Sequence, residues 1–274
     1  MNKYIKVFDT VEEYNAYSGS TSFTSPNISY VKGNDKSYYD DNEIKHYTAD
    51  VWMETIPKEE LTSTTFNKVN SYITQVELPN NITTIGGEAF KGCSSLTSVT
   101  IGSGVTSIGN NAFNGCSSLT SIDIPNSITS IGSGAFSYCD SLLSFNYPSG
   151  VTTNIGLNNC GSLTSVTFSN NVTEIINFFS CAKLKRINSD IDGVAIIPSS
   201  VTSIANYGFN YQKLIKYFYF YSITPPNIGS DIFYKSGGIY QVNAIYVPSE
   251  SVELYKTATN WSAYANKIQA IPNN

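Results

Sequence analysis

The chain has 274 residues, of which 41% are hydrophobic, so it can bury the core of one large domain or of two ordinary ones. Charged residues make up 14% and the formal net charge is −5, which argues against a surface that follows phosphate groups and therefore against nucleic acid as a partner. No run approaches the ~18 apolar residues of a membrane span, so we do not expect the chain to span a membrane.

Residues 1–60 are predicted to form a region separate from the rest of the chain. Residues 3–9 alternate like a strand, and residues 10–17 open with a capping box, Thr-x-x-Glu, that favours a short helix. Two further strands are expected over residues 27–31 and 37–40. Together these elements form either a small β-α-β-β module or an N-terminal cap. About 60 residues exceed what capping requires, which favours the module.

The same region holds the chain's one histidine, His46, and no residue lies at a spacing that would make it a catalytic base. The acidic run at residues 40–43 lacks the alternating ligand spacing of a calcium loop, so a solvated turn is the better interpretation. Neither a phosphate-binding loop nor a Gly-x-Ser-x-Gly motif occurs in the sequence. We therefore expect no catalytic residue, no metal site and no cofactor, and we do not expect an enzyme.

The middle of the chain is a repeat. One pattern of apolar residues, with Ala-Phe and a cysteine at fixed places, occurs three times at intervals of 23 residues. Shortened or degenerate copies precede and follow these three. The three regular copies begin at Ile82, Val105 and Ile128, and the others begin at Phe66, Val151, Val172 and Val201. The last copy continues through Ile204, Phe209 and Leu214, which are expected in the core. A fixed period in the twenties indicates a solenoid, whereas a sandwich of unrelated hairpins would not give identical spacing in successive copies.

The copies contain two apolar residues separated by one residue, Val-x-Ile in the first regular copy, and this pair predicts a short strand. Alternation points both apolar side chains inward and the residue between them outward. The Ala-Phe pair returns an aromatic ring to the core. A single copy cannot bury these positions, so neighbouring copies are expected to stack, with parallel strands roughly 4.7–4.9 Å apart.

The five cysteines occupy the same position in successive copies and should form an interior ladder. Neighbouring thiols would come within disulfide reach, but their side chains should run parallel rather than toward one another. A linear ladder also does not converge as zinc ligands must. We interpret these residues as buried thiols that act as small hydrophobes: Cys93, Cys116, Cys139, Cys160 and Cys181.

The pattern Ile-Gly-x-x-Ala-Phe-x-x-Cys-x-x-Leu-x-x-Val-x-Ile resembles the bacterial BspA-like leucine-rich repeat family. The tail, from Ile223-Thr-Pro-Pro through Ile245-Tyr-Val-Pro to Ile268, is similar to the family's C-terminal closing module. The resemblance covers residues ~62–271. It implies a leucine-rich-repeat solenoid, α/β by convention but β-rich, with a curved parallel sheet of short strands and capped ends.

The resemblance also implies a place and a role. Members of the family are typically secreted or displayed on the cell surface and look like adhesins that bind host extracellular proteins. The family has no conserved catalytic residues to carry over. The first nine residues lack the apolar stretch of a signal peptide, and a leader that had been removed and replaced by Met1 would leave the same start.

The domain boundaries follow from the repeat. Residues 61–222 form the leucine-rich repeats and residues 223–274 form a closing repeat with a capping helix. Ser249 is the expected N-cap of that helix. The apolar side chains expected to cover the last core layer are Val252, Tyr255, Trp261, Tyr264 and Ile268.

The outward positions of the strands are the candidate binding residues. Most are short and polar, with Asp123, Asn146 and Asn188 in one line and Arg186 beside it. At the C-terminal end, residues 217–221 alternate Tyr and Phe. Because Phe has no polar group, it should face the core, which leaves Tyr217, Tyr219 and Tyr221 outward beside Tyr246. A slip of one residue, or coverage by the C-terminal helix, would bury these tyrosines instead.

We expect a non-catalytic binding protein whose partner is a host or neighbouring-cell protein. The alternative is a glycan-capture module in which the tyrosines stack on sugar rings.

Overall fold

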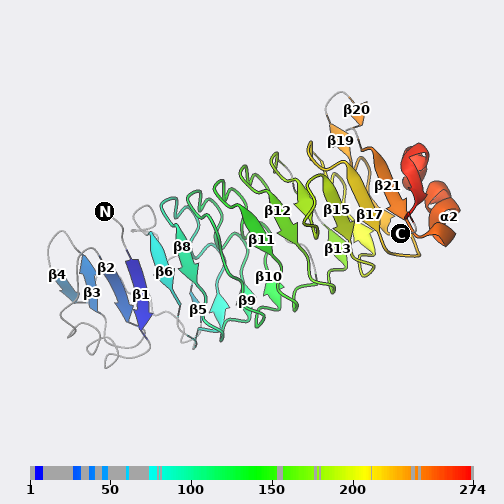
Figure 1. Cartoon of the computed structure of the whole chain (residues 1–274). Coiled ribbons are helices and arrows are strands. Elements are labelled where there is room, and N and C mark those ends of the chain that lie inside the picture. Colours follow the sequence, from blue (N-terminus) through cyan, green and yellow to red (C-terminus); the bar gives the residue numbers. More distant parts are fainter. Residues whose placement is uncertain are drawn as a thin grey trace. The chain divides into compact units, whose positions relative to one another are not determined.

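The computed structural model of the chain describes residues 4–8, 27–31, 37–40, 45–48, 60–61, 74–78, 80, 82–152, 157–175, 178, 180–210, 212–235, 238–239 and 242–272. It divides into two compact units, Met1–Cys139 and Asp140–Asn274. Each unit is a stack of solenoid coils built on parallel β-sheet (Figure 1).

The first unit contains two parallel sheets. In its described part, the main sheet has the order β2-β1-β6-β8 and the return sheet has the order β10-β9-β7-β5, while β3 and β4 pair antiparallel. The elements are β1 (Tyr4–Phe8), β2 (Asn27–Val31), β3 (Ser37–Asp40), β4 (Lys45–Thr48), β5 (Glu60–Leu61), β6 (Gln75–Glu77), β7 (Thr84–Ile85), β8 (Ser98–Thr100), β9 (Ser107–Ile108) and β10 (Ser130–Ile131).

The strands expected near the N-terminus are confirmed as β1, β2 and β3. β1 pairs in parallel with β6, Tyr4 opposite Gln75 and Lys6 opposite Glu77, so the N-terminal segment contributes strands to the main sheet. The helix expected over residues 10–17 lies outside the described residues.

The second unit repeats this plan. Among its described residues, the main sheet has seven strands in the order β11-β12-β14-β15-β17-β21-β22 and the return sheet has the order β13-β16-β18. The elements are β11 (Ser144–Asn146), β12 (Ser165–Thr167), β13 (Glu174–Ile175), β14 (Arg186–Ile187), β15 (Val194–Ile197), β16 (Ser203–Ile204), β17 (Tyr217–Phe220), β18 (Asn227–Ile228), β19 (Tyr234–Lys235), β20 (Gly238–Ile239), β21 (Ala244–Val247), η1 (Ser249–Ser251), α2 (Val252–Thr257), η2 (Trp261–Lys267) and β22 (Ile268–Ala270).

The core of each unit consists of the predicted inward positions. In the first unit the rings of Phe90, Phe113 and Phe136 stack with centroids 5.1 and 5.3 Å apart and nearly parallel planes. All five cysteines are buried and none forms a disulfide. In the first unit the Cys116 and Cys139 thiols donate to the carbonyls of Phe90 and Phe113 in the preceding coil, which confirms the interior ladder there. Burial raises the pKa of the Cys93 thiol to about 12. For Cys116, burial raises the pKa, and charge on Cys139 or Cys93 would raise it further.

Two predictions about the repeat pattern are wrong. Leu214, expected in the core, is 45% exposed, and its neighbour Ile215 is buried. The reason is that Gln212 occupies the cysteine position of this copy, so the regular spacing of three residues places Ile215, and not Leu214, in the core. Residues 121–123 were expected to form a strand but are irregular, although Ile122 is still buried.

The backbone conformation at the turns also repeats from coil to coil. The residue before each cysteine has a left-handed backbone, with φ of 77° at Gly115 and 60° at Tyr138. Gly109 has a different constraint: a Cβ there would meet the backbone nitrogen of Gly87 at 2.4 Å, so the Ile-Gly turns of successive coils stack in a space that admits only glycine.

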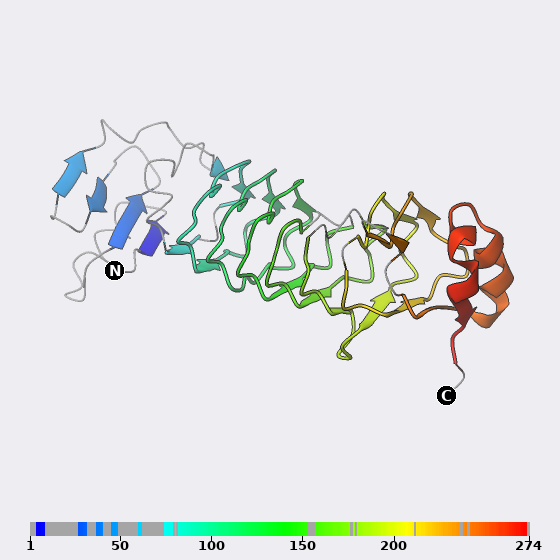
Figure 2. The same ribbon diagram turned by 90° about the horizontal axis from the view of Figure 1, so that it is seen from above.

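The C-terminal residues close the last coil, with α2 and η2 packed beside the end of the sheet (Figure 2). Tyr255, Trp261 and Tyr264 are buried as expected, and the Trp261 indole Nε1–H donates to the Pro226 carbonyl at 2.8 Å. Val252 is only half-buried. The expected helix N-cap at Ser249 is wrong: residues 249–251 form a 3₁₀ turn and the Ser249 hydroxyl bonds the Glu250 carboxylate.

Candidate binding surface

The strand β17 places its tyrosines on the outer side of the main sheet. Phe218 and Phe220 are each 1% exposed, whereas Tyr217 is 37% and Tyr221 49% exposed. Tyr219, between them, is half-buried. The predicted alternation is therefore confirmed, and neither a register slip nor the C-terminal helix buries these rings.

The neighbouring strands extend this surface. Tyr219 lies opposite Tyr246 of β21, and the two rings stack with centroids 4.6 Å apart, while Tyr217 and Tyr246 are 6.5 Å apart. On the other side, β15 places Val194 opposite Tyr217 and Ile196 opposite Tyr219, both half-buried. We call this surface the aromatic face; it consists of Val194, Ile196, Tyr217, Tyr219, Tyr221 and Tyr246.

The surroundings of Tyr219 raise its pKa. Burial raises the pKa of Tyr219, and the negative charges that Tyr246, Tyr221 and Tyr217 acquire on ionisation raise it further. The Tyr217 hydroxyl accepts a hydrogen bond of 3.1 Å from the Asn243 side-chain amide. The rings present both an apolar plane and a polar tip, a combination common at recognition surfaces.

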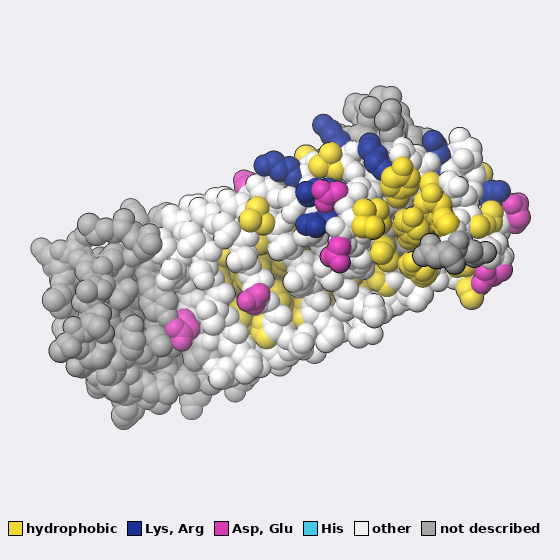
Figure 3. Space-filling model, in the orientation of Figure 1, with side chains coloured by type: hydrophobic (Ala, Val, Ile, Leu, Met, Phe, Trp, Pro, Cys, Tyr) yellow, Lys and Arg dark blue, Asp and Glu magenta, His cyan; other side chains and the backbone are white. Residues whose placement is uncertain are grey.

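Charged side chains lie along one side of the aromatic face (Figure 3). Lys185 pairs with Asp192 at 2.8 Å, and the Arg186 Nε lies 3.5 Å from the other oxygen of the same carboxylate. These groups are partly exposed, so each pair contributes little to stability. They give the apolar surface a polar rim.

Next to the aromatic face the main sheet is interrupted. β14 ends at Ile187, whereas β12 on one side runs to Thr167 and β15 on the other runs to Ile197. Parallel strands usually need a connection of a dozen or more residues, but only residues 188–193 join β14 to β15. Left-handed backbone at both ends of this loop, φ 48° at Asn188 and 86° at Gly193, makes the short connection feasible.

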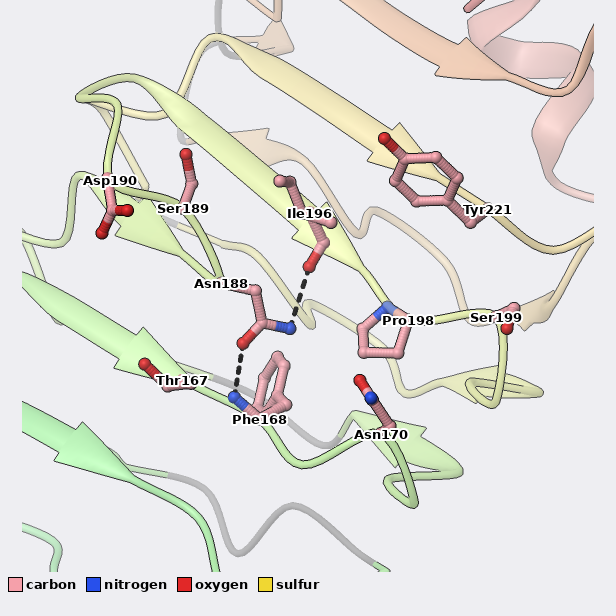
Figure 4. A pocket seen from close by; sticks show the side chains of 10 residues that line it. All are labelled: Thr167, Phe168, Asn170, Asn188, Ser189, Asp190, Ile196, Pro198, Ser199 and Tyr221. Carbon is pink, nitrogen blue, oxygen red and sulfur yellow. Dashed lines mark hydrogen bonds between the residues drawn. The ribbon is translucent and has the colours of Figure 1, made fainter.

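Asn188 bridges the resulting gap. Its Oδ1 accepts a hydrogen bond of 2.6 Å from the Phe168 backbone N–H, and its Nδ2 donates one of 3.1 Å to the Ile196 carbonyl (Figure 4). The side chain replaces the backbone ladder that the missing residues of β14 would have made. Asn188 was expected on the outward line of a strand; instead it follows the strand and both ends of its amide are bonded within the sheet.

A cavity of about 710 Å³ lies over this gap, and we call it the notch. Thr167 and Phe168 line one side and Ile196 and Pro198 the other. The remaining lining residues are Asn170, Asn188, Ser189, Asp190, Ser199 and Tyr221.

The other predicted site residues are distributed differently. Asn146 is exposed on β11, separated from β17 by β12, β14 and β15, so it does not join the aromatic face. Asp123 is exposed in the first unit, on the irregular segment at residues 121–123. Arg186 is half-buried at the rim. Sequence reasoning missed Val194, Ile196 and the notch; the signal was the insertion at residues 190–193, which breaks the period.

Within the described part of the chain, no three His, Cys, Asp or Glu side chains come together as a metal site would require. No helix among the described residues has the length and apolar character needed to cross a bilayer.

Comparison with known proteins gives a family and a fold. The family profile described as "BspA type Leucine rich repeat region" matches residues 59–185 and 178–260, in six copies. No curated protein matches the chain significantly.

Solved leucine-rich repeat structures are similar at low sequence identity and with TM-scores below 0.5. A leucine-rich repeat protein of T. pallidum is 28% identical, with 53% of this chain and 70% of that chain covered and a TM-score of 0.44. A leucine-rich cell surface protein of Faecalibacterium prausnitzii is 22% identical, with 91% and 96% covered and a TM-score of 0.44. A leucine-rich repeat protein of Bacteroides ovatus is 19% identical, with 82% and 71% covered and a TM-score of 0.42.

Proposed function

The chain belongs to the BspA-type leucine-rich repeat family, and from this premise we propose that it is a non-catalytic binding protein that contacts a protein partner through its aromatic face. We further propose that it acts outside the cell, secreted or on the cell surface, where a host or neighbouring-cell protein is within reach. Repeat solenoids of this kind characteristically bind on an extended sheet surface.

One observation carries the choice of surface. Tyr219 and Tyr246 stack at 4.6 Å on the outer side of the sheet, with exposed Tyr217 beside them. Preorganised aromatic rings lose little conformational freedom on binding, and Tyr is enriched among residues that dominate protein–protein affinity. The polar rim at Lys185 and Asp192 matches the usual arrangement of an apolar centre surrounded by charged groups.

The polar sheet positions are the weaker part of the proposal. Asn146 and Asp123 are exposed, so they remain available to an extended partner. Arg186, at the rim, can contribute a charged contact, whereas the Asn188 amide is already engaged within the sheet. We therefore place the centre of binding on the tyrosines.

The test is the double variant Tyr219→Ala/Tyr246→Ala, measured for binding to a panel of immobilised, purified host extracellular proteins. We expect affinity for the partner found with the native protein to fall at least about tenfold, because removing a central aromatic pair costs more than 1.4 kcal/mol of binding. The control is Tyr207→Ala, which removes an exposed tyrosine (44%) outside the main sheet.

Thermal melting of the same variants completes the test. A melting temperature close to the native value would assign the loss to recognition. If the double variant instead loses several kcal/mol of stability, the rings serve as core and this face is not the binding site. Binding to glycans only, on an array, would favour the glycan-capture alternative.

A further inference from the structure

The notch is a polar cavity whose hydrogen-bonding groups are largely unused. The side chains of Asn170, Asp190 and Ser199 line it and make no hydrogen bond within the described part of the chain. Together they offer an amide, which donates and accepts, a hydroxyl, which does both, and a carboxylate, which accepts. In contrast, both ends of the Asn188 amide are bonded within the sheet, to Phe168 and Ile196.

One wall of the notch is apolar and flat. Tyr221 is 49% exposed, and its ring lies on the far side of Pro198 from Asn170 (Figure 4). Ile196 continues this wall along β15. An aromatic plane next to a set of amide and hydroxyl groups suits a ligand that has an apolar face and a polar edge.

The charge of the lining limits the ligand further. No Lys or Arg is among the residues that line the notch, and Asp190 is its one ionisable carboxylate. A phosphate or carboxylate ligand would meet Asp190 without a compensating cation. A ligand cation would have a single exposed carboxylate as its partner, which is a weak pairing. The lining therefore fits a neutral, hydroxyl-rich molecule.

We propose that the notch binds a saccharide, with one neutral pyranose ring against Tyr221 and Pro198 and with hydroxyl groups of this ring and of further sugar units bonded by Asn170, Asp190 and Ser199. The cavity volume of about 710 Å³ lies within the usual 300–1,000 Å³ range of ligand sites and leaves room for more than the first ring. This site goes beyond the protein-binding role of the aromatic face: it shares Ile196 and Tyr221 with that face, but its polar groups, Asn170, Asp190 and Ser199, do not belong to it.

The experiment uses the full chain and saturation-transfer NMR with neutral methyl pyranosides of glucose, galactose, mannose, fucose and N-acetylglucosamine. Glucuronate and inorganic phosphate are the charged probes, and tethered oligosaccharides distinguish a free sugar from a polymer. We expect at least one neutral pyranoside to bind with a dissociation constant in the millimolar range or tighter. Stronger binding of the same sugar in a chain would identify a polysaccharide as its source.

The variants Asn170→Ala and Tyr221→Ala should each weaken sugar binding about tenfold, the effect of one lost hydrogen bond or one lost stacking contact. Asn146→Ala and Tyr207→Ala are the matched controls, since Asn146 is an exposed asparagine on the same sheet and Tyr207 an exposed tyrosine elsewhere. Both controls should bind the sugar normally.

The variants distinguish the saccharide site from the proposed protein-binding function. Tyr219→Ala/Tyr246→Ala should leave sugar binding intact, and Asn170→Ala should leave binding of a protein partner intact. The saccharide site is overturned if no neutral sugar binds at millimolar concentration, if the charged probes bind equally well, or if the notch variants bind like the controls.

Discussion

The side chain of Gln212 donates a hydrogen bond of 2.7 Å from Nε2 to the backbone carbonyl of Phe178, in the preceding repeat. In an earlier coil the Cys116 thiol makes the equivalent bond to Phe90, at 3.3 Å. In each case the acceptor belongs to the preceding repeat and lies three residues before the cysteine of that repeat, Cys93 or Cys181. Glutamine therefore replaces cysteine in the ladder without loss of the bond that ties one coil to the next.

This relationship predicts the effect of Gln212→Met, which preserves side-chain length but removes the donor. The variant should lower the free energy of unfolding by about 1–3 kcal/mol, because the Phe178 carbonyl is left without that bond. The buried Oε1 of Gln212 has no partner among the described residues, so its removal offsets part of the cost. Urea unfolding measures the change, and Gln269→Met, at an exposed position of β22, should be neutral. If Gln212→Met leaves the free energy of unfolding unchanged, the hydrogen bond to Phe178 does not stabilise the fold.

The buried thiols predict a loss of stability at alkaline pH. Burial raises the pKa of Cys93 from 9.0 to about 12, so the folded chain keeps a proton that the unfolded chain releases near pH 9. The stabilisation is fully present below pH 9 and is lost as the pH rises from 9 toward 12. Cys116 is shifted in the same direction. Each such thiol should add a slope of about 1.4 kcal/mol per pH unit within that window.

Urea unfolding at pH 7.5, 9 and 10.5 measures this slope. Cys93→Ala should be less stable than the native chain at pH 7.5, and its stability should fall less steeply above pH 9. Identical slopes for the two proteins would show that this thiol does not titrate differently in the folded state.

The left-handed position before each cysteine gives a pair of opposite predictions. Gly115→Ala should cost about 1 kcal/mol through backbone strain alone, because the added Cβ would lie 3.6 Å from the nearest atom, an ordinary contact. Tyr138→Gly, at the same position one coil later, should stabilise the fold by a few tenths to about 1 kcal/mol, since its ring is 53% exposed. Thermal melting of both variants checks the sign, and an equal effect of both would contradict the assignment.

The C-terminal closure depends on Trp261. Its ring is fully buried and packs edge-on against Phe220 at 5.1 Å and Tyr255 at 4.9 Å. Trp261→Ala should therefore cost about 3–5 kcal/mol and expose the last coil. Leu254→Ala on α2, where the side chain is 50% exposed, is the matched control and should cost less than 1 kcal/mol. Urea unfolding together with light scattering would detect both destabilisation and aggregation.

The N-terminal region yields a prediction about domain boundaries. We propose that residues 1–60 act as a cap, because β1 continues the sheet of β6. Deleting residues 1–58, which leaves β5 in place, should expose the edge of β6 and lower the unfolding midpoint in urea. If the shortened chain unfolds at the native midpoint, the region is an independent module instead.

The local pattern of the sequence determined the coil. Period-two alternation in Tyr217–Phe220 was enough to separate tyrosines from phenylalanines, because Phe has no group that water can solvate by hydrogen bonding. The 23-residue interval likewise placed Cys93 and Cys116 in one interior ladder. These features depend on the spacing of residues within one repeat and on stacking of identical neighbours.

The tertiary structure decided where the pattern is broken and what fills the break. Gln212 bonds a carbonyl 34 residues earlier, and Asn188 joins Phe168 and Ile196 across a gap in the sheet. Spacing predicts which residues share a position in the coil, but it does not predict which polar side chain will satisfy a backbone group when the repeat is altered. That choice depends on the distance and direction between groups in different coils. At the notch, where β14 ends early, the buried backbone groups of Phe168 and Ile196 must find a partner, and the Asn188 side chain supplies it.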